Sequence, residues 1–105
     1  MYHMEPVIVL CTCPTAEARD LATTLLEERY VACASMSDVT SRYIWNDDVE
    51  EAEETLLVMK TVRKQWPTLR ERIRELHSYD VPEVLMVPVS DGAADYLAWL
   101  DSVIA

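Results

Sequence analysis

The chain has 105 residues, half of them hydrophobic, which is enough for one domain with one core and too few for two. Its 19 acidic and 9 basic side chains give a formal net charge of −10, which disfavours binding to nucleic acid or to an anionic membrane surface. A single glycine excludes glycine-rich phosphate loops, and no apolar run approaches the roughly 20 residues of a membrane span.

The first half of the chain predicts a strand, a helix and a long hairpin. Val7–Leu10 is an unbroken aliphatic run, typical of a strand that is covered on both faces. After Pro14, we expect Thr15 to cap an amphipathic helix that extends through Leu26. Apolar residues then resume at 31–36, break at 37–38 and continue at 39–45. The polar triplet at 46–48 predicts a turn, and a further strand is clearest at 56–59.

The second half predicts a helix, a strand and a final helix. Apolar residues at helical spacing run from Trp66 to Leu76, with Pro67 tolerated in the first turn, so the helix should end near His77. The stretch 84–89 predicts another buried strand. The last helix follows Gly92, and its expected buried residues are Tyr96, Leu97, Leu100, Val103 and Ile104.

This order of elements predicts an α+β fold in a single domain spanning residues 1–105. It is the βαββαβ, ferredoxin-like arrangement, an antiparallel sheet with helices on one face, plus a C-terminal helix. The other sheet face needs a cover, and its apolar strands favour self-association of this small chain.

Several short motifs, in register from about residue 7 to residue 100, resemble the CutA divalent-cation tolerance family. They are Val9-Leu10-Cys11-Thr12, Ala32-Cys33, Thr40-Ser41 with Tyr43 and Trp45, Glu54 with Lys60-Thr61, His77 with Tyr79, Pro82-Glu83, and Tyr96-Leu97-Ala98-Trp99-Leu100. The resemblance implies a homotrimer with no established catalytic activity and a role in tolerance of copper and other divalent cations. The family is similar to the PII nitrogen-signalling proteins, which implies small-ligand binding in clefts between subunits.

The resemblance also implies candidate copper ligands. The cysteine of the family's proposed copper site corresponds to Cys11, and the second of its two adjacent histidines corresponds to His77. Leu76 stands at the position of the first histidine, so Glu83, a water or a neighbouring subunit would have to complete the site. His3, near the start, could make only an adventitious ligand.

The residues themselves leave alternatives open at each of these positions. The side chains of Cys11 and Cys13 should share one face of a strand, where thiolates suit a soft metal, but free cysteine is also a common core residue. Cys33 is expected in the core. His77 at a helix C-terminus is favoured as an imidazolium by the helix dipole without any metal.

Charged and aromatic residues give further candidates. Glu54 and Lys60 match family positions; about 20 Å apart on one strand face, they must serve different contacts. Six of the eight residues at 47–54 are acidic, which fits either hard-cation binding or, by preference, a solvated hairpin tip. Aromatic side chains could line a ligand cleft or pack at a subunit interface; they are Tyr43, Trp45, Tyr96 and Trp99.

These observations give three functional hypotheses. The first is a non-enzymatic, cytoplasmic homotrimer linked to divalent-cation tolerance that binds copper weakly through Cys11 and His77. The second is a PII-like regulatory module that binds a small molecule in inter-subunit clefts. The third is a trimeric scaffold for unknown protein partners. The three cysteines favour a reducing compartment and no secretory signal is visible. No nucleophile–base pair suggests an enzyme.

Overall fold

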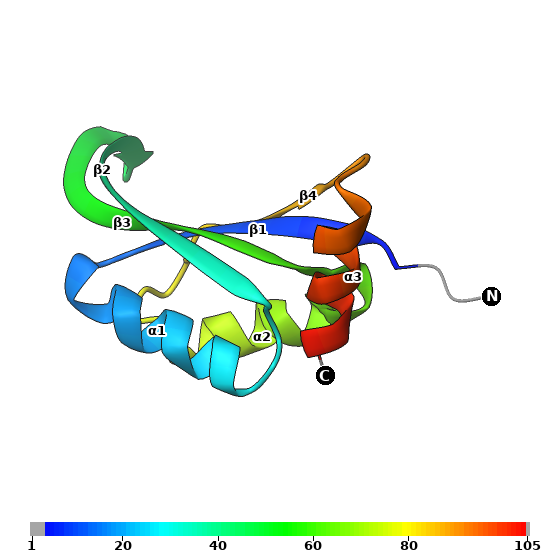
Figure 1. Cartoon of the computed structure of the whole chain (residues 1–105). Helices are drawn as coiled ribbons and strands as arrows, with labels where there is room; N and C mark the ends of the chain where they lie inside the picture. Colours follow the sequence, from blue (N-terminus) through cyan, green and yellow to red (C-terminus); the bar gives the residue numbers. More distant parts are fainter. Residues whose placement is uncertain (1–3, 105) are drawn as a thin grey trace.

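The computed structural model describes residues 4–104 as one four-stranded antiparallel sheet with helices beneath it (Figure 1). The strands are ordered β2-β3-β1-β4. Their bounds, with those of the helices, are β1 Pro6–Cys13, α1 Thr15–Glu27, β2 Cys33–Trp45, β3 Asp48–Val62, a short 3-10 turn Arg63–Gln65, α2 Trp66–Leu76, β4 Val84–Pro88 and α3 Ala94–Val103. The predicted order of elements is confirmed. His3 lies outside the described residues.

The core lies between one face of the sheet and the helices α1 and α2. Along β1, buried and half-buried residues alternate, and the buried set is Val7, Val9, Cys11 and Cys13. Leu25 of α1 and Leu69 and Ile73 of α2 pack against this set. Alternation is the pattern of a strand with one covered face, so the expectation of a strand covered on both faces is wrong for the single chain.

Strand β4 is an edge strand and is not buried as expected. It pairs only with β1, and Leu85 and Val87 are 53% and 42% exposed. Both side chains lie on the face opposite the helices, because they pair with Leu10 and Ile8, which lie between the buried positions of β1. The helices reach only the other face.

The helix boundaries agree with the sequence pattern except at one cap. Helix α2 has Pro67 in its first turn and ends at His77, as predicted. Helix α1 begins at Thr15 itself, so Thr15 is not the N-cap; Pro14 occupies that position without a side-chain bond. The Thr15 hydroxyl instead lies 3.0 Å from the Thr55 hydroxyl, at hydrogen-bond distance.

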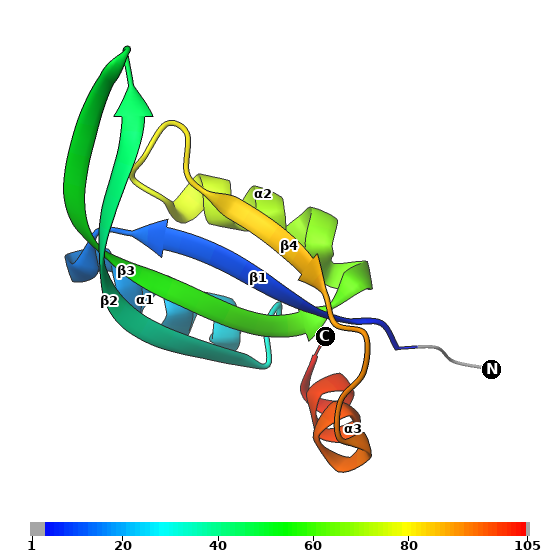
Figure 2. The same ribbon diagram turned by 90° about the horizontal axis from the view of Figure 1, so that it is seen from above.

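The hairpin of β2 and β3 is long and continuous. The expected break at Ser37 and Asp38 is absent, because both residues pair in register with β3 and the Asp38 carboxylate accepts a hydrogen bond from Thr55. The predicted turn is confirmed, and Asn46 and Asp47 adopt the positive φ angles that a tight hairpin turn requires. The hairpin projects beyond the helices (Figure 2), and the molecule measures 50 × 26 × 22 Å.

Helix α3 packs at the far end of the sheet from the hairpin tip (Figure 2). Leu100 is buried, as expected, but Tyr96 is exposed and lies against Trp99 with ring centroids 5.6 Å apart. The helix contacts the body along one stripe only, so the prediction that Tyr96 is buried is wrong for the single chain. Within residues 4–104, no helix is long and apolar enough to cross a membrane.

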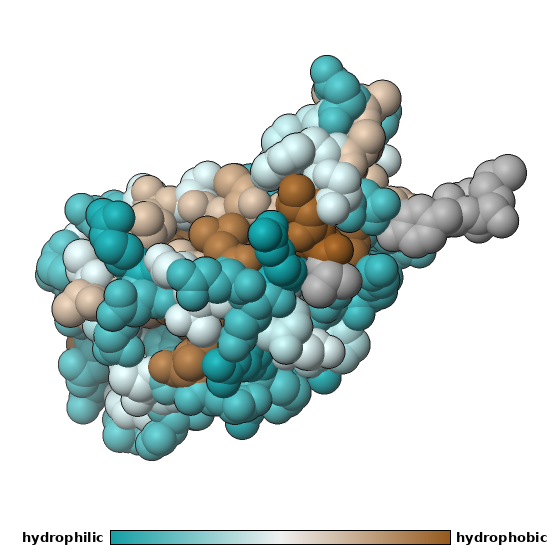
Figure 3. Space-filling model, turned by 60° about the horizontal axis from the view of Figure 1, so that its bottom comes forward, coloured by the Kyte–Doolittle hydropathy of each residue, from teal (hydrophilic) through white to brown (hydrophobic). Residues whose placement is uncertain are grey.

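The two sides of the molecule differ in polarity. The underside, which α1 and α2 form, is mainly hydrophilic with small separate apolar patches (Figure 3). The opposite side of the sheet, which we call the open face, carries apolar side chains from three neighbouring strands. By the strand register they are Ile8, Leu10, Leu56, Val58, Leu85 and Val87.

Candidate functional site: a cleft at the base of the hairpin

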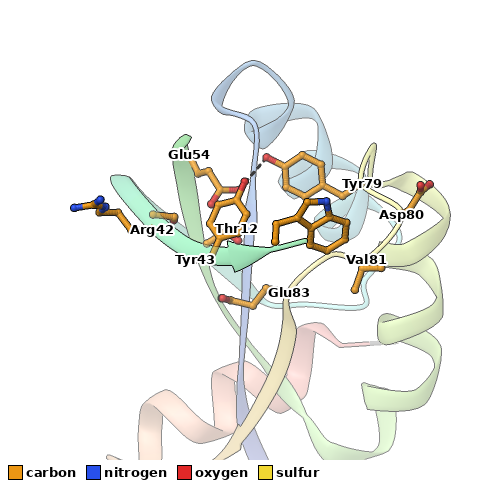
Figure 4. Close-up of a pocket in the computed structure, with 10 residues that line it drawn as sticks. Thr12, Arg42, Tyr43, Glu54, Tyr79, Asp80, Val81 and Glu83 are labelled. Carbon is orange, nitrogen blue, oxygen red and sulfur yellow. Dashed lines mark hydrogen bonds between the residues drawn. The ribbon is translucent and has the colours of Figure 1, made fainter. Parts of the chain in front are cut away.

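A cleft of about 610 Å³ lies where the hairpin leaves the sheet (Figure 4). Its walls come from the end of β1, the hairpin, and the segment that joins α2 to β4. The lining residues are Thr12, Ser41, Arg42, Tyr43, Trp45, Glu54, Tyr79, Asp80, Val81 and Glu83. Ser41, Tyr43 and Trp45 alternate along β2 and therefore share one strand face. The volume is that of a site for a metabolite-sized molecule.

A buried carboxylate and a phenol form the polar centre of the cleft. Glu54 is only 5% exposed, and its Oε2 accepts a 3.0 Å hydrogen bond from the Tyr79 hydroxyl. Burial, with the hydrogen bond and charge of Glu54, raises the pKa of Tyr79 to about 12. The phenol therefore stays protonated and remains a donor at neutral pH.

His77 is held as a neutral imidazole behind this pair. Its Nδ1 accepts a 3.1 Å hydrogen bond from the Tyr79 backbone N–H, and its Nε2 lies 2.8 Å from the Thr12 carbonyl oxygen. A carbonyl can only accept, so Nε2 carries the proton and Nδ1 does not. The ring is neutral in this arrangement, not the imidazolium expected at a helix end. It links α2 and the cleft segment to β1.

Cys11 and Cys13 are both fully buried and share a strand face, as predicted. Burial, then the neighbouring thiol and the Glu83 and Glu54 carboxylates, raises the pKa of Cys11 to about 12. Burial, then Glu17 and Glu54, raises the pKa of Cys13 to about 11. Both side chains are therefore thiols at neutral pH without a metal, and a soft metal would have to displace the thiol proton to bind.

Cys33 does not lie in the core as expected. It starts β2 on the open face, half-buried, and its Sγ lies 3.7 Å from Lys60 Nζ. Lys60 also donates a 2.9 Å hydrogen bond to Ser35. Glu54 is hydrogen-bonded to Tyr79 and not to Lys60, so Glu54 and Lys60 serve separate contacts.

The residues present do not fit a copper ion in this conformation. The Thr12 carbonyl oxygen lies between the two proposed ligands: the Cys11 thiol donates to it at 3.6 Å and His77 at 2.8 Å. Both ring nitrogens of His77 are thus engaged, and Glu83 is an exposed residue of the cleft wall. Among residues 4–104, no three metal-ligating side chains come together.

The other sequence candidates separate into two groups. Tyr43, Trp45 and Glu54 meet in the cleft, whereas Tyr96 and Trp99 lie apart from it on α3. The acidic stretch of the hairpin is exposed except at Ala52 and Glu54, and it is tied across the strands by a Thr40–Glu53 hydrogen bond of 2.9 Å and an Arg42–Glu51 ion pair of 3.5 Å.

Sequence reasoning missed six wall residues as site residues: Thr12, Ser41, Arg42, Tyr79, Asp80 and Val81. Of these, Thr12, Ser41 and Tyr79 were signalled only by their places in family motifs. A loop between a helix and a strand has no periodicity that would show where its side chains point.

An antiparallel sheet in this strand order, with two helices on one face, places the chain in the ferredoxin-like α+β class, to which PII-like proteins belong. The family model of the CutA1 divalent ion tolerance protein matches residues 7–103. The chain therefore belongs to the CutA divalent-cation tolerance family.

Individual relatives agree with this assignment. The chain is 43% identical over 95 residues to the divalent-cation tolerance protein CutA of Thermus thermophilus, covering 89% of this chain and 92% of the relative. The PII-like protein CutA from Nostoc sp. PCC 7120, in apo form, superposes with a TM-score of 0.91 at 30% identity, covering 94% of this chain and 97% of that one. A protein from Archaeoglobus fulgidus, described as periplasmic divalent cation tolerance protein CutA, gives 0.93 at 27% identity, covering 95% and 99%.

Proposed function

We propose that this chain acts in divalent-cation tolerance as a non-enzymatic homotrimer that binds a small molecule in the cleft at the hairpin base. The observation that carries the proposal is the cleft itself, with a nearly buried carboxylate–phenol pair and aromatic walls. Small-molecule sites are typically apolar hollows with a few placed polar groups. The likeness to a relative described as PII-like supports a regulatory role.

The open face supports the homotrimer. Within residues 4–104, neither helix α1 nor helix α2 covers it, and Leu85 and Val87 are half-exposed there. Continuous apolar patches of this kind mark protein–protein contacts. A second copy of the chain is the proposed cover, and residues of that copy would complete the cleft.

Direct copper binding by Cys11 and His77 is the weaker hypothesis, because one carbonyl oxygen engages both residues. Calorimetric titration of reduced protein with Cu(I) and Cu(II), beside Cys11→Ser, tests it. We expect weak heats that the substitution leaves unchanged. Tight stoichiometric binding that is lost in Cys11→Ser would restore copper sequestration as the function.

The cleft is tested by a ligand-observed NMR screen of small metabolites against the wild type and Trp45→Leu. We expect hits whose saturation signals vanish in the variant. A screen without any such hit contradicts small-molecule binding and leaves the scaffold hypothesis, for which the exposed hairpin residues Ile44 and Val49 would be the contact surface.

We propose the cytoplasm as the compartment. The three cysteines are unpaired, and a reducing environment keeps them so. The periplasmic description of the Archaeoglobus fulgidus relative is the alternative, and fractionation of cells that express the tagged chain separates the two.

A further inference from the structure

The cleft has an unequal distribution of charge. Glu54 points toward Tyr79 and Glu83 lies on the opposite side of the lining, whereas Arg42 and Asp80 point outward at its two sides (Figure 4). The one cationic lining residue, Arg42, is paired with Glu51 outside the cleft. The interior is therefore anionic, within a chain that already carries a net charge of −10. An anionic ligand would be repelled, and a cation attracted.

The Glu54 carboxylate has one oxygen that a ligand can reach. Within residues 4–104 no buried side-chain oxygen or nitrogen lacks a hydrogen-bond partner, so the oxygen that Tyr79 leaves unbonded is open to solvent. The bond from Tyr79 is the single side-chain hydrogen bond that Glu54 makes within residues 4–104, and it occupies one of two oxygens. A carboxylate that is 5% exposed is largely removed from water, and a charged carboxylate in that position gains from a positive ligand group. Its second oxygen is available to receive one.

The aromatic walls decide between a metal ion and an organic cation. A metal ion needs several converging oxygen, nitrogen or sulfur ligands, and no such group of three exists within residues 4–104. Tyr43 and Trp45 are half-exposed beside the carboxylates, and Tyr79 completes the wall. A diffuse ammonium charge is attracted by aromatic faces as well as by carboxylates, whereas a hydrated metal ion is not matched to such a surface.

We propose that the ligand of this cleft is an organic cation, a molecule whose ammonium group lies against Glu54 and Glu83 and contacts Tyr43 or Trp45. This rests on the proposed function, since it names the ligand class for the same cleft. The assignment also separates the cleft's chemistry from metal sequestration: cation tolerance would then be regulated through an organic cation, without a bound metal.

The test compares three probes of one shape and different charge: choline, the neutral 3,3-dimethylbutan-1-ol and the anionic 3,3-dimethylbutanoate. Ligand-observed NMR measures their affinities for the wild type, up to about 50 mM. We expect choline to bind at least about tenfold more tightly than the neutral probe, and the anion not at all. Equal binding of the choline and alcohol probes, or absence of choline binding, overturns the inference.

Variants locate the binding. Glu54→Gln should weaken choline binding about tenfold and leave the alcohol unchanged, whereas Trp45→Leu should weaken both. Glu53→Gln is the matched control, because Glu53 is the neighbouring residue on the opposite strand face and does not line the cleft. A loss in Glu53→Gln as large as that in Glu54→Gln would show non-specific attraction to the acidic hairpin and refute the site. Metabolite hits in the screen without any preference for cations would refute the cation while the proposed function stands.

Discussion

The Tyr79–Glu54 hydrogen bond makes a quantitative prediction about stability. The bond is 3.0 Å long and its acceptor is a nearly buried carboxylate. Hydrogen bonds to charged groups contribute about 1.5–3 kcal/mol. Because Tyr79 is 38% exposed, water can replace part of the lost bond, so the low end applies. We expect Tyr79→Phe to lower the free energy of unfolding by about 1.5 kcal/mol per chain.

A double-mutant cycle isolates this bond from the packing of the two side chains. Tyr79→Phe, Glu54→Ala and the double variant are unfolded in guanidinium chloride at one chain concentration, because the proposed assembly would make stability depend on concentration. The expected coupling energy is about 1–1.5 kcal/mol. Tyr96→Phe is the matched control, because Tyr96 is similarly exposed and its hydroxyl makes no hydrogen bond within residues 4–104. This substitution should change the free energy of unfolding by less than about 0.5 kcal/mol. A coupling energy below about 0.3 kcal/mol would refute the role assigned to the bond.

Three further predictions follow from the described contacts. Leu85→Lys, on the open face, should reduce the mass measured by light scattering from that of a trimer toward that of the 12.0 kDa chain. The control variant Glu71→Lys on α2 should leave the mass unchanged. A trimer that persists in Leu85→Lys contradicts an interface at the open face. In Cys33→Ser, a thiol reagent should label the native protein negligibly and both remaining thiols after unfolding, because both are fully buried; rapid native labelling would be inconsistent with this burial. Glu54→Gln should lower the pKa of Tyr79 from about 12 toward its ordinary 10.0, measured by tyrosinate absorbance, because the Glu54 charge is removed. Because the pKa of Tyr79 is raised in the folded chain, its contribution to stability is fully present below pH 10 and is lost as the pH rises through about 12. An unchanged alkaline transition in Glu54→Gln would contradict the assignment.

The sequence predicted the fold well because its signals are local and repeated. The stripe of apolar residues in α2 and its proline in the first turn place that helix, and the Asn46–Asp47 turn places the hairpin. The error in the hairpin has a physical origin in backbone pairing. Ser37 and Asp38 were interpreted as a break, yet their backbone groups pair with β3 regardless of their polar side chains.

Exposure was predicted less well than the order of elements. The sequence pattern predicts that the apolar run in β4 is buried, but α1 and α2 both pack on one face of the sheet and leave the other face of β4 exposed. An apolar sequence shows that a surface needs a cover, not which molecule supplies it. In the proposed homotrimer, another chain would cover Leu85.

The candidate copper ligands show why residue type alone could not define the site. Cys11 and His77 do come close to one another, as the family motif implied, but they do so around the Thr12 carbonyl. That backbone oxygen has no signature in the sequence, and it determines the tautomer of His77. The same histidine then accepts the Tyr79 N–H, which places the phenol against Glu54. In this chain, the residues that resemble a metal site fix the geometry of the neighbouring cleft, which is why substitutions at His77 should alter ligand binding there without any change in metal content.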